Sequence, residues 1–236
     1  MTEREVRLAR LSRKETLERA AAGAVGLLPV GSLEQHGDHL PIGTDAFLAE
    51  AVCLDAARRV SCDILVAPPL WTGFSPHHLR FGATVTLAGE TFVALVRETA
   101  ASLSRWLDPV VVVNGHGGNR GLLEALALEG GPRVVTYWEL PEATACAEEA
   151  FPEDHGSIGH AGQAETSMML ALHRALVGEP AGGFEPCVPG DSLAVPDLGE
   201  SGVIGDAKAA SADAGGRFLE AAASGLAAYV NRLCNR

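Results

Sequence analysis

The stretch Gly31–Asp45, GSLEQHGDHLPIGTD, concentrates side chains that bind metal ions. It holds two histidines and three carboxylates in fifteen residues, more than an ordinary surface loop needs. Glu34 and His36 stand two residues apart, so in an extended segment their side chains point the same way. Imidazole favours the later transition metals and carboxylate favours harder cations, so the mixture suits zinc, manganese or iron. The stretch therefore predicts one part of a metal centre.

Two later stretches supply residues of the same kinds. NGHGGN contains His116 and follows an apolar run, and GHAGQAET contains His160 and Glu165. His160 and Glu165 are five residues apart, about 140° around a helix, so they cannot share one helical face. We therefore expect His160 in the turn before a helix and Glu165 in its first turn. Asp45 has a similar expected place, where the helix dipole favours a carboxylate.

Together these stretches predict a centre with two divalent ions. The expected ligands are Glu34, His36, Asp45, His116 and Glu165. Two ions roughly 3.5–4 Å apart can hold a bridging hydroxide as nucleophile, polarise a carbonyl and stabilise a tetrahedral intermediate. His160 would carry a proton to the leaving nitrogen, so His160 and Glu165 are the catalytic candidates. Zinc is the expected metal, with manganese or iron(II) as alternatives at one site.

Each stretch also has a structural interpretation when taken alone. NGHGGN could be a simple strand–helix turn, and HxGxxE could be a helix start with a carboxylate matched to the dipole. A non-catalytic metal or small-molecule binder is the alternative from another functional class, although it would not need a proton carrier such as His160. A nucleotide-binding loop fits poorly, because the spacing is not GxGxxG and no Walker lysine follows.

The elements that would position these residues alternate along the chain. Strands are expected at 24–30, 63–69, 83–87, 109–114 and 133–137. Helices are expected at 44–60, with Thr44 as N-cap, and at 89–107, 121–131, 164–176 and 214–233. This alternation predicts an α/β sandwich with a mainly parallel sheet, whose carboxyl edge binds ligands. The Gly- and Pro-rich segment 178–205 is expected to cover the site or join a subunit interface.

Composition narrows the class of partner. The net charge of −12 disfavours nucleic acid and anionic membrane surfaces. No apolar run approaches the roughly 20 residues of a membrane span, and the charged N-terminus is not a signal peptide. The five cysteines are scattered without a CxxC pair, which predicts free thiols in a reducing cytoplasm. We therefore expect a cytoplasmic protein with a small-molecule substrate.

Three motifs together resemble the creatininase family of metal-dependent amidohydrolases. They are PVGSLEQHGDHLPIGTD, NGHGGN and HAGQAET, with further likeness at GVIGDAKAASADAGGRFLEAA. The resemblance implies a single three-layer α/β/α domain over 1–236, with a binuclear centre at the carboxyl edge of the sheet. It also implies a homo-oligomer, since many members form hexamers. It assigns metal ligands to Glu34, His36, Asp45 and His116, with Asp45 bridging and His160 catalytic.

The chain departs from the creatinine-opening members at two places. Those members carry Tyr-Glu directly after the histidine that matches His116, and that Glu is a metal ligand; here the residues are Gly117 and Gly118. They also carry Trp-Asp where this chain has Gly156 and Ser157. Glu165 is our candidate for the missing ligand. Both differences argue against creatinine and leave other branches open: formamidopyrimidine deformylase, mycofactocin-maturation peptidase and inosose hydrolase.

The substrate side is expected along TGFSPHHLRFGATVTL and directly after the strand expected at 133–137. The candidate substrate-binding residues are Ser75, His77, His78, Gly117 and Trp138, where the resemblance supplies a serine near Ser75. Glu139 could also reach the pocket. Asp38 and His39 could orient the ligands or be solvated. Trp71 and Trp106 are expected in the core.

Overall fold

The structure is a computed structural model that describes residues 4–154, 157–180 and 198–234. At its centre lies a four-stranded sheet in the order β2–β1–β3–β4, with all neighbouring strands parallel. The strands are β1 (Val25–Val30), β2 (Ile64–Val66), β3 (Val110–Asn114) and β4 (Arg133–Thr136). Every residue of β1 and β3 is buried, which is typical of a parallel sheet covered on both faces.

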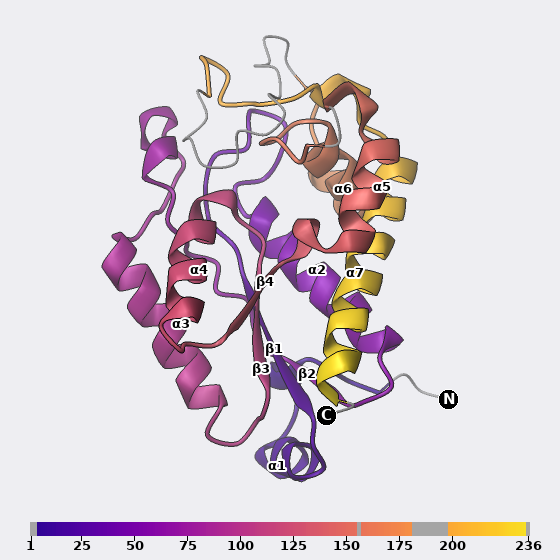
Figure 1. The fold of residues 1–236 in the computed structure, drawn as a ribbon. Coiled ribbons are helices and arrows are strands. Elements are labelled where there is room, and N and C mark those ends of the chain that lie inside the picture. Colours follow the sequence, from indigo (N-terminus) through magenta and orange to yellow (C-terminus); the bar gives the residue numbers. More distant parts are fainter. Residues whose placement is uncertain (1–3, 155–156, 181–197, 235–236) are drawn as a thin grey trace.

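Helices cover the two faces of this sheet (Figure 1). The α-helices are α1 (Arg13–Ala21), α2 (Thr44–Arg59), α3 (Gly89–Leu103), α4 (Arg120–Leu128), α5 (Pro141–Ala150), α6 (Gln163–His173) and α7 (Ala212–Cys234). Short 3-10 helices lie at Leu8–Arg10, Pro76–Phe81, Gly117–Asn119, Tyr137–Glu139, Pro152–Asp154, Arg174–Leu176 and Ala207–Ala209. Helices α3 and α4 pack on one face, and α2, α5, α6 and α7 pack on the other. The predicted α/β/α arrangement is confirmed.

Two hydrophobic clusters hold the layers together. Phe92 and Leu123 of α3 and α4 pack against one face of the sheet. Phe151, Phe218 and Leu48 belong to the cluster on the other face. These side chains are fully buried, and burying each contributes about 1.5–3 kcal/mol to stability. The strand ends that lead to the chemically active stretches are therefore anchored on both sides.

Four of the five predicted strands are confirmed, and the one expected at 83–87 is wrong. Residues 83–87 form no strand: the segment makes only isolated bridges, Val85 to Leu33 and Thr86 to Gly73. Val85 is exposed, so its β-branched pattern has no buried face to pack on the sheet. The Thr44 N-cap is also wrong by one position. Gly43 is the N-cap, and the Thr44 hydroxyl donates to the Pro41 carbonyl at 2.7 Å.

Of three other expectations, two are wrong and one is confirmed. Cys62 and Cys234 form a disulfide, so the prediction that all cysteines are free thiols is wrong. The two are 172 residues apart, a pairing that spacing alone could not reveal. Trp71 is 53% exposed and does not belong to the core, because it lies in the loop that follows β2. Trp106 packs against the α3–α4 cluster as expected.

Much of the long Gly- and Pro-rich segment lies outside the described residues, namely 181–197 and with it Cys187. Its described end, however, contacts the chemically active stretches, because the backbones of Ile204 and His160 exchange hydrogen bonds. In the described part of the chain, no helix has both the length and the apolar character needed to cross a membrane.

Candidate metal centre

The stretch Gly31–Asp45 and the NGHGGN stretch meet because the strands before them, β1 and β3, are neighbours in the sheet. Val30 pairs with Asn114, so the residues after them leave the sheet side by side at its carboxyl edge. Gly31 lets the first turn of α2 approach this edge. A Cβ at Gly31 would lie 2.5 Å from the Ala46 backbone nitrogen, which no larger residue could accommodate. This close approach brings Asp45 of α2 to the strand ends.

One group of ligands comes from the strand ends and the start of α2. We call Glu34, Asp45 and His116 the strand-side triad, because their ligand atoms lie within 4.8 Å of one another. His116 Nδ1 is 2.9 Å from Asp45 Oδ2 and 3.2 Å from Glu34 Oε1. All three side chains are buried. The arrangement offers one imidazole and two carboxylates to a cation.

A second group adds the start of α6. We call His36, Asp45 and Glu165 the helix-side triad, since Glu165 lies in the first turn of α6 as predicted. His36 Nε2 is 3.0 Å from Asp45 Oδ1 and 3.7 Å from Glu165 Oε2. Asp45 thus turns one carboxylate oxygen to each triad. That is the geometry of a carboxylate that bridges two ions.

The carboxylate oxygens test whether this donor set fits cations. Glu34 Oε1, Glu34 Oε2 and Asp45 Oδ2 are buried and make no hydrogen bond. A buried charged oxygen without a partner costs free energy, which a coordinated cation would offset. Tetrahedral and higher coordination by imidazole nitrogen and carboxylate oxygen suits zinc and manganese. The residues present therefore fit a pair of divalent ions.

Backbone carbonyls decide which nitrogen of each histidine carries a proton. His36 Nδ1 lies 3.0 Å from the Glu34 carbonyl and His116 Nε2 lies 3.2 Å from the Phe74 carbonyl. Because a carbonyl only accepts, those nitrogens donate, which leaves His36 Nε2 and His116 Nδ1 as the nitrogens that face the carboxylates and would bind a cation once deprotonated. A carbonyl behind each ligating imidazole is the usual support of a metal-bound histidine.

The charges of the cluster shift the pKa values strongly in the absence of metal. Burial lowers the pKa of His116, but the Glu34 and Asp45 carboxylates raise it to about 10. Burial raises the pKa of Glu34, but the neighbouring His116 imidazolium lowers it to about 2. Burial also raises the pKa of Glu165. In the metal-free centre, protons on the imidazoles therefore balance the negative charge of the carboxylates, which bound cations would otherwise balance.

His160 stands beside the centre as a neutral imidazole. Its Nε2 donates to the Gln35 carbonyl at 2.9 Å, and its Nδ1 lies 3.7 Å from Glu34 Oε1. Burial and the neighbouring His36 lower the pKa of His160 well below its ordinary value. His160 precedes α6, as predicted. An uncharged base facing the carboxylates is able to accept and return a proton.

Helix α6 is held against the first active stretch by its own polar contacts. His39 Nε2 is 2.9 Å from Thr166 Oγ1, and the Ala161 backbone N–H donates to Glu165 Oε2 at 2.5 Å. His39 is buried and touches the residue next to Glu165, whereas Asp38 is exposed. Of the two outer candidates, only His39 contacts an element that carries a ligand.

The substrate-side candidates lie at different depths. His78 is buried, with Nε2 3.2 Å from Glu34 Oε1, and His77 is partly buried and stacks on the His116 ring. Gly117 is exposed and Trp138 is partly buried. Ser75 is fully buried beside His116. Glu139 lies near the surface, where its carboxylate is 2.9 Å from Arg120 Nε.

Gly118 leaves no room for the carboxylate that creatinine-opening members carry there. A Cβ at Gly118 would overlap the Phe74 carbonyl oxygen and would stand 2.5 Å from His116 Nε2. At Gly117, by contrast, an added Cβ would have no neighbouring atom within 4 Å. Position 118 therefore has no room for a ligand side chain, and Glu165 is the third member of the helix-side triad.

Sequence reasoning missed residues that support the ligands. Gln35 lies between two ligands in sequence, and its amide reaches His78 Nδ1 at 2.8 Å and the Gly202 carbonyl at 2.9 Å. Asn119 joins two loops, donating to the Gly31 carbonyl and accepting from the Phe74 N–H. Both residues stand inside the quoted motifs, so their place in the motif was the available signal. Gly156 lies outside the described residues.

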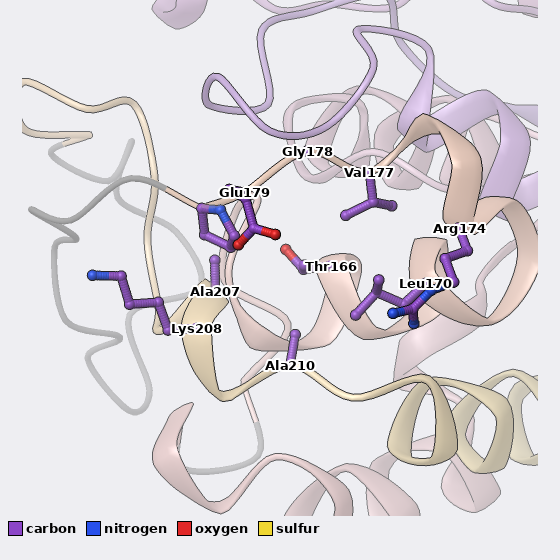
Figure 2. A pocket seen from close by; sticks show the side chains of 10 residues that line it. Thr166, Leu170, Arg174, Val177, Gly178, Glu179, Ala207, Lys208 and Ala210 are labelled. Atoms are coloured by element: carbon purple, nitrogen blue, oxygen red, sulfur yellow. The ribbon is translucent and has the colours of Figure 1, made fainter.

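A separate pocket of about 360 Å³ lies along α6 and is lined by Thr166 and Leu170 of that helix and by Arg174, which follows it (Figure 2). Glu179 and Lys208 lie across from the helix. No residue of either triad lines it. Thr166 contacts His39, and no triad side chain reaches the pocket, so this pocket is not where the triads would act on a substrate.

Comparison with known proteins identifies the class. The family profile described as creatinine amidohydrolase (creatininase) matches residues 9–230. The mycofactocin precursor peptide peptidase of Mycolicibacterium smegmatis is 33% identical over 87% of this chain and 84% of its own length. The creatinine amidohydrolase of Pseudomonas putida is 32% identical over 92% of this chain and 93% of its own. This α/β/α protein with an acidic and histidine-rich cluster thus has relatives that are hydrolases.

Solved structures agree with the sequence matches. A creatininase structure described with manganese superposes with a TM-score of 0.77 at 32% identity, covering 97% of this chain and 98% of that one. Another, described as the Zn–Zn type, has the same TM-score. The chain belongs to the creatininase family of hydrolases, which act on carbon–nitrogen bonds. Other relatives are a 3-dehydro-scyllo-inosose hydrolase and a formylaminopyrimidine deformylase.

Proposed function

We propose that this chain hydrolyses an amide or cyclic amide bond of a small molecule at a centre of two divalent ions. The observation that carries the proposal is the pair of buried triads that share Asp45, in which both oxygens of Glu34 and Oδ2 of Asp45 make no hydrogen bond. The strand-side ion would be held by Glu34, Asp45 and His116. The helix-side ion would be held by His36, Asp45 and Glu165. Zinc is the proposed metal, with manganese or iron(II) at one site as alternatives.

The metals would supply a nucleophile from water at neutral pH and polarise the substrate carbonyl. The protein residues would manage the protons. His160, neutral and with Nδ1 facing the centre, accepts the proton that water loses as it attacks the carbonyl carbon. It then donates that proton to the leaving nitrogen as the carbon–nitrogen bond breaks. The Gln35 carbonyl holds the His160 ring in place throughout.

The substrate class follows from the departures at the site. Gly117 is exposed and Gly118 has no side chain, so the mouth of the centre lacks the Tyr-Glu pair of creatinine-opening members. This supports a substrate other than creatinine. The candidates are the compounds on which other branches act: a formamidopyrimidine, a modified peptide or an inosose. The proposed substrate contacts are Gly117, His77, His78 and Trp138.

The proposed activity is tested with purified, metal-loaded protein against creatinine, formylated aminopyrimidines, cyclic amides and a short peptide. We expect hydrolysis of at least one class, with activity lost on chelation and restored by zinc or manganese. His116→Ala should abolish it. A protein that binds two metals but hydrolyses no compound, and whose metal binding is unchanged in His160→Ala, would instead be a non-catalytic metal binder.

We also propose that the chain forms a homo-oligomer, with a hexamer expected from the resemblance. Phe47 and Leu172 support this, since both are 37% exposed and line a pocket of about 370 Å³ between α2 and α6. Exposed apolar side chains gathered in one place are typical of interfaces. Light scattering would give the subunit number. Cytoplasmic location stays a prediction, because the Cys62–Cys234 bond removes the argument from free thiols.

A further inference from the structure

We propose that Ser75, supported by Ser32, is a positioning residue that fixes the proton and the orientation of His116 for metal binding. The inference rests on the proposed function, because it concerns how a ligand of the strand-side ion is prepared. It assigns to the buried Ser32–Ser75 pair a role in metal affinity, distinct from substrate binding.

The contacts form a chain that ends at His116 Nε2, the ring nitrogen opposite the one that faces Glu34 and Asp45. Ser75 Oγ is 3.0 Å from His116 Nε2, and Ser32 Oγ is 2.5 Å from Ser75 Oγ. Both serines are fully buried. The Ser75 backbone N–H donates to Thr86 Oγ1 at 2.8 Å, which fixes the residue that carries the hydroxyl. The hydroxyl therefore has a defined place behind the imidazole.

The Phe74 carbonyl sets the direction of this chain. It lies 3.2 Å from His116 Nε2 and can only accept, so Nε2 carries the proton. Ser75 Oγ then also accepts from Nε2, and its own O–H donates to Ser32 Oγ. With one proton fixed on Nε2, the nitrogen left to exchange its proton for an ion is Nδ1, which faces Glu34 and Asp45. Hydrogen bonds of this kind raise the basicity of a ligating imidazole and hold its ring.

The same atoms also match the spacing of a Ser–His–Asp triad. The His116 ring lies between Ser75 Oγ and Asp45 Oδ2, and its Nδ1 is 2.9 Å from the carboxylate. A nucleophilic serine would have to give its proton to Nε2. The Phe74 carbonyl at Nε2 opposes that, and Ser75 has no exposed surface through which a substrate carbonyl could approach. The geometry points to positioning and away from nucleophilic attack.

The test compares Ser75→Ala and Ser32→Ala with Ser167→Ala. Ser167 is a matched control because it is also fully buried, but its hydroxyl accepts from the Ser211 backbone N–H instead of contacting an imidazole. Cobalt(II) is titrated into metal-free protein, and the absorption bands of the bound ion are followed. We expect Ser75→Ala to weaken cobalt binding about 10–100-fold and to shift the bands. Ser32→Ala should weaken it less, and Ser167→Ala should not change it.

Three results would overturn the proposal. Ser75→Ala could bind cobalt as wild type does while KM alone rises, which would make Ser75 a substrate contact. Ser75 could react with a fluorophosphonate probe, which would make it a nucleophile. Ser32→Ala could bind cobalt unchanged; this variant decides the matter if Ser75→Ala does not fold, because its side chain does not touch the imidazole. Failure of the wild type to bind cobalt would contradict the proposed function itself.

Discussion

The strand-side and helix-side triads share Asp45, yet different kinds of structure position them. Glu34 and His116 follow β1 and β3, whose paired register places them together through backbone hydrogen bonds. Glu165 stands on α6, which is located by packing against α7 and by the His39–Thr166 contact. The position of Glu34 and His116 therefore depends on sheet register, whereas the position of Glu165 depends on how α6 packs.

This difference bears on how each triad obtains its carboxylates. On the strand side, Glu34 follows β1 and Asp45 lies in the first turn of α2. On the helix side, the second carboxylate comes from Glu165 at the start of α6, whereas Gly118, which lies beside His116 on the strand side, has no room for a side chain. Glu165 Oε2 lies 3.7 Å from His36 Nε2, so the start of α6 brings a carboxylate to the helix side.

Loss of the shared ligand should have the largest effect. In Asp45→Asn, each triad loses a charged oxygen, so we expect neither ion to be retained after dialysis. Activity should fall by more than the roughly 10–100-fold that removal of an outer partner costs. Elemental analysis and turnover measure both. If Asp45→Asn keeps one ion at full occupancy, Asp45 does not belong to both triads.

Loss of a ligand on one side should remove one ion. Glu165→Gln keeps the size of the side chain and removes its charge, so the helix-side ion should be lost while the strand-side ion remains. His116→Ala is the matched variant for the strand side and should have the reverse effect. Metal content should fall from two ions to one in each variant, without a comparable change in thermal unfolding. Unchanged content in Glu165→Gln would refute the assignment of this ligand.

A side chain at 118 should disturb the strand side. In Gly118→Ala, the added carbon meets the Phe74 carbonyl and His116 Nε2, so the free energy of unfolding should fall by about 1–3 kcal/mol. Gly117→Ala is the stability control, because its added carbon meets nothing, and it should stay within about 0.5 kcal/mol of wild type. Gly118→Glu should also fail to restore metal to Glu165→Gln. Restoration would show that position 118 can still supply a ligand.

Metal affinity should rise with pH. The pKa of His116 in the metal-free protein is raised to about 10, so below that pH the ion must displace a proton from Nδ1. Each unit of pH gained below 10 should then strengthen binding about tenfold for each proton released. Isothermal titration in buffers of different ionisation enthalpy counts these protons. Affinity that is independent of pH between 6 and 9 would contradict the charge state assigned to the cluster.

The sequence predicted the sheet and most of the helices because their residues are buried in regular patterns. The run Val110–Asn114 is apolar up to its last residue and sits at the centre of the sheet. The strand expected at 83–87 failed because its β-branched residues lie in a segment without a strand partner. Local propensity carries no information about such partners.

The candidate ligands were found from residue type and motif position, but their supports depend on distant contacts. Ser32 meets Ser75, 43 residues away, and Gln35 meets Gly202, 167 residues away. The Cys62–Cys234 bond spans a comparable separation. Such contacts arise from packing in three dimensions, which a single sequence read along its length does not contain.

The central claim is that two ions lie on either side of Asp45. A crystal structure of the protein grown with zinc or manganese, with anomalous difference maps collected at the metal edge, tests it most directly. We predict two peaks roughly 3.5–4 Å apart, one contacting His116 and Glu34 and the other contacting His36 and Glu165, with Asp45 touching both. A single peak, or a second peak away from Glu165, would contradict the account.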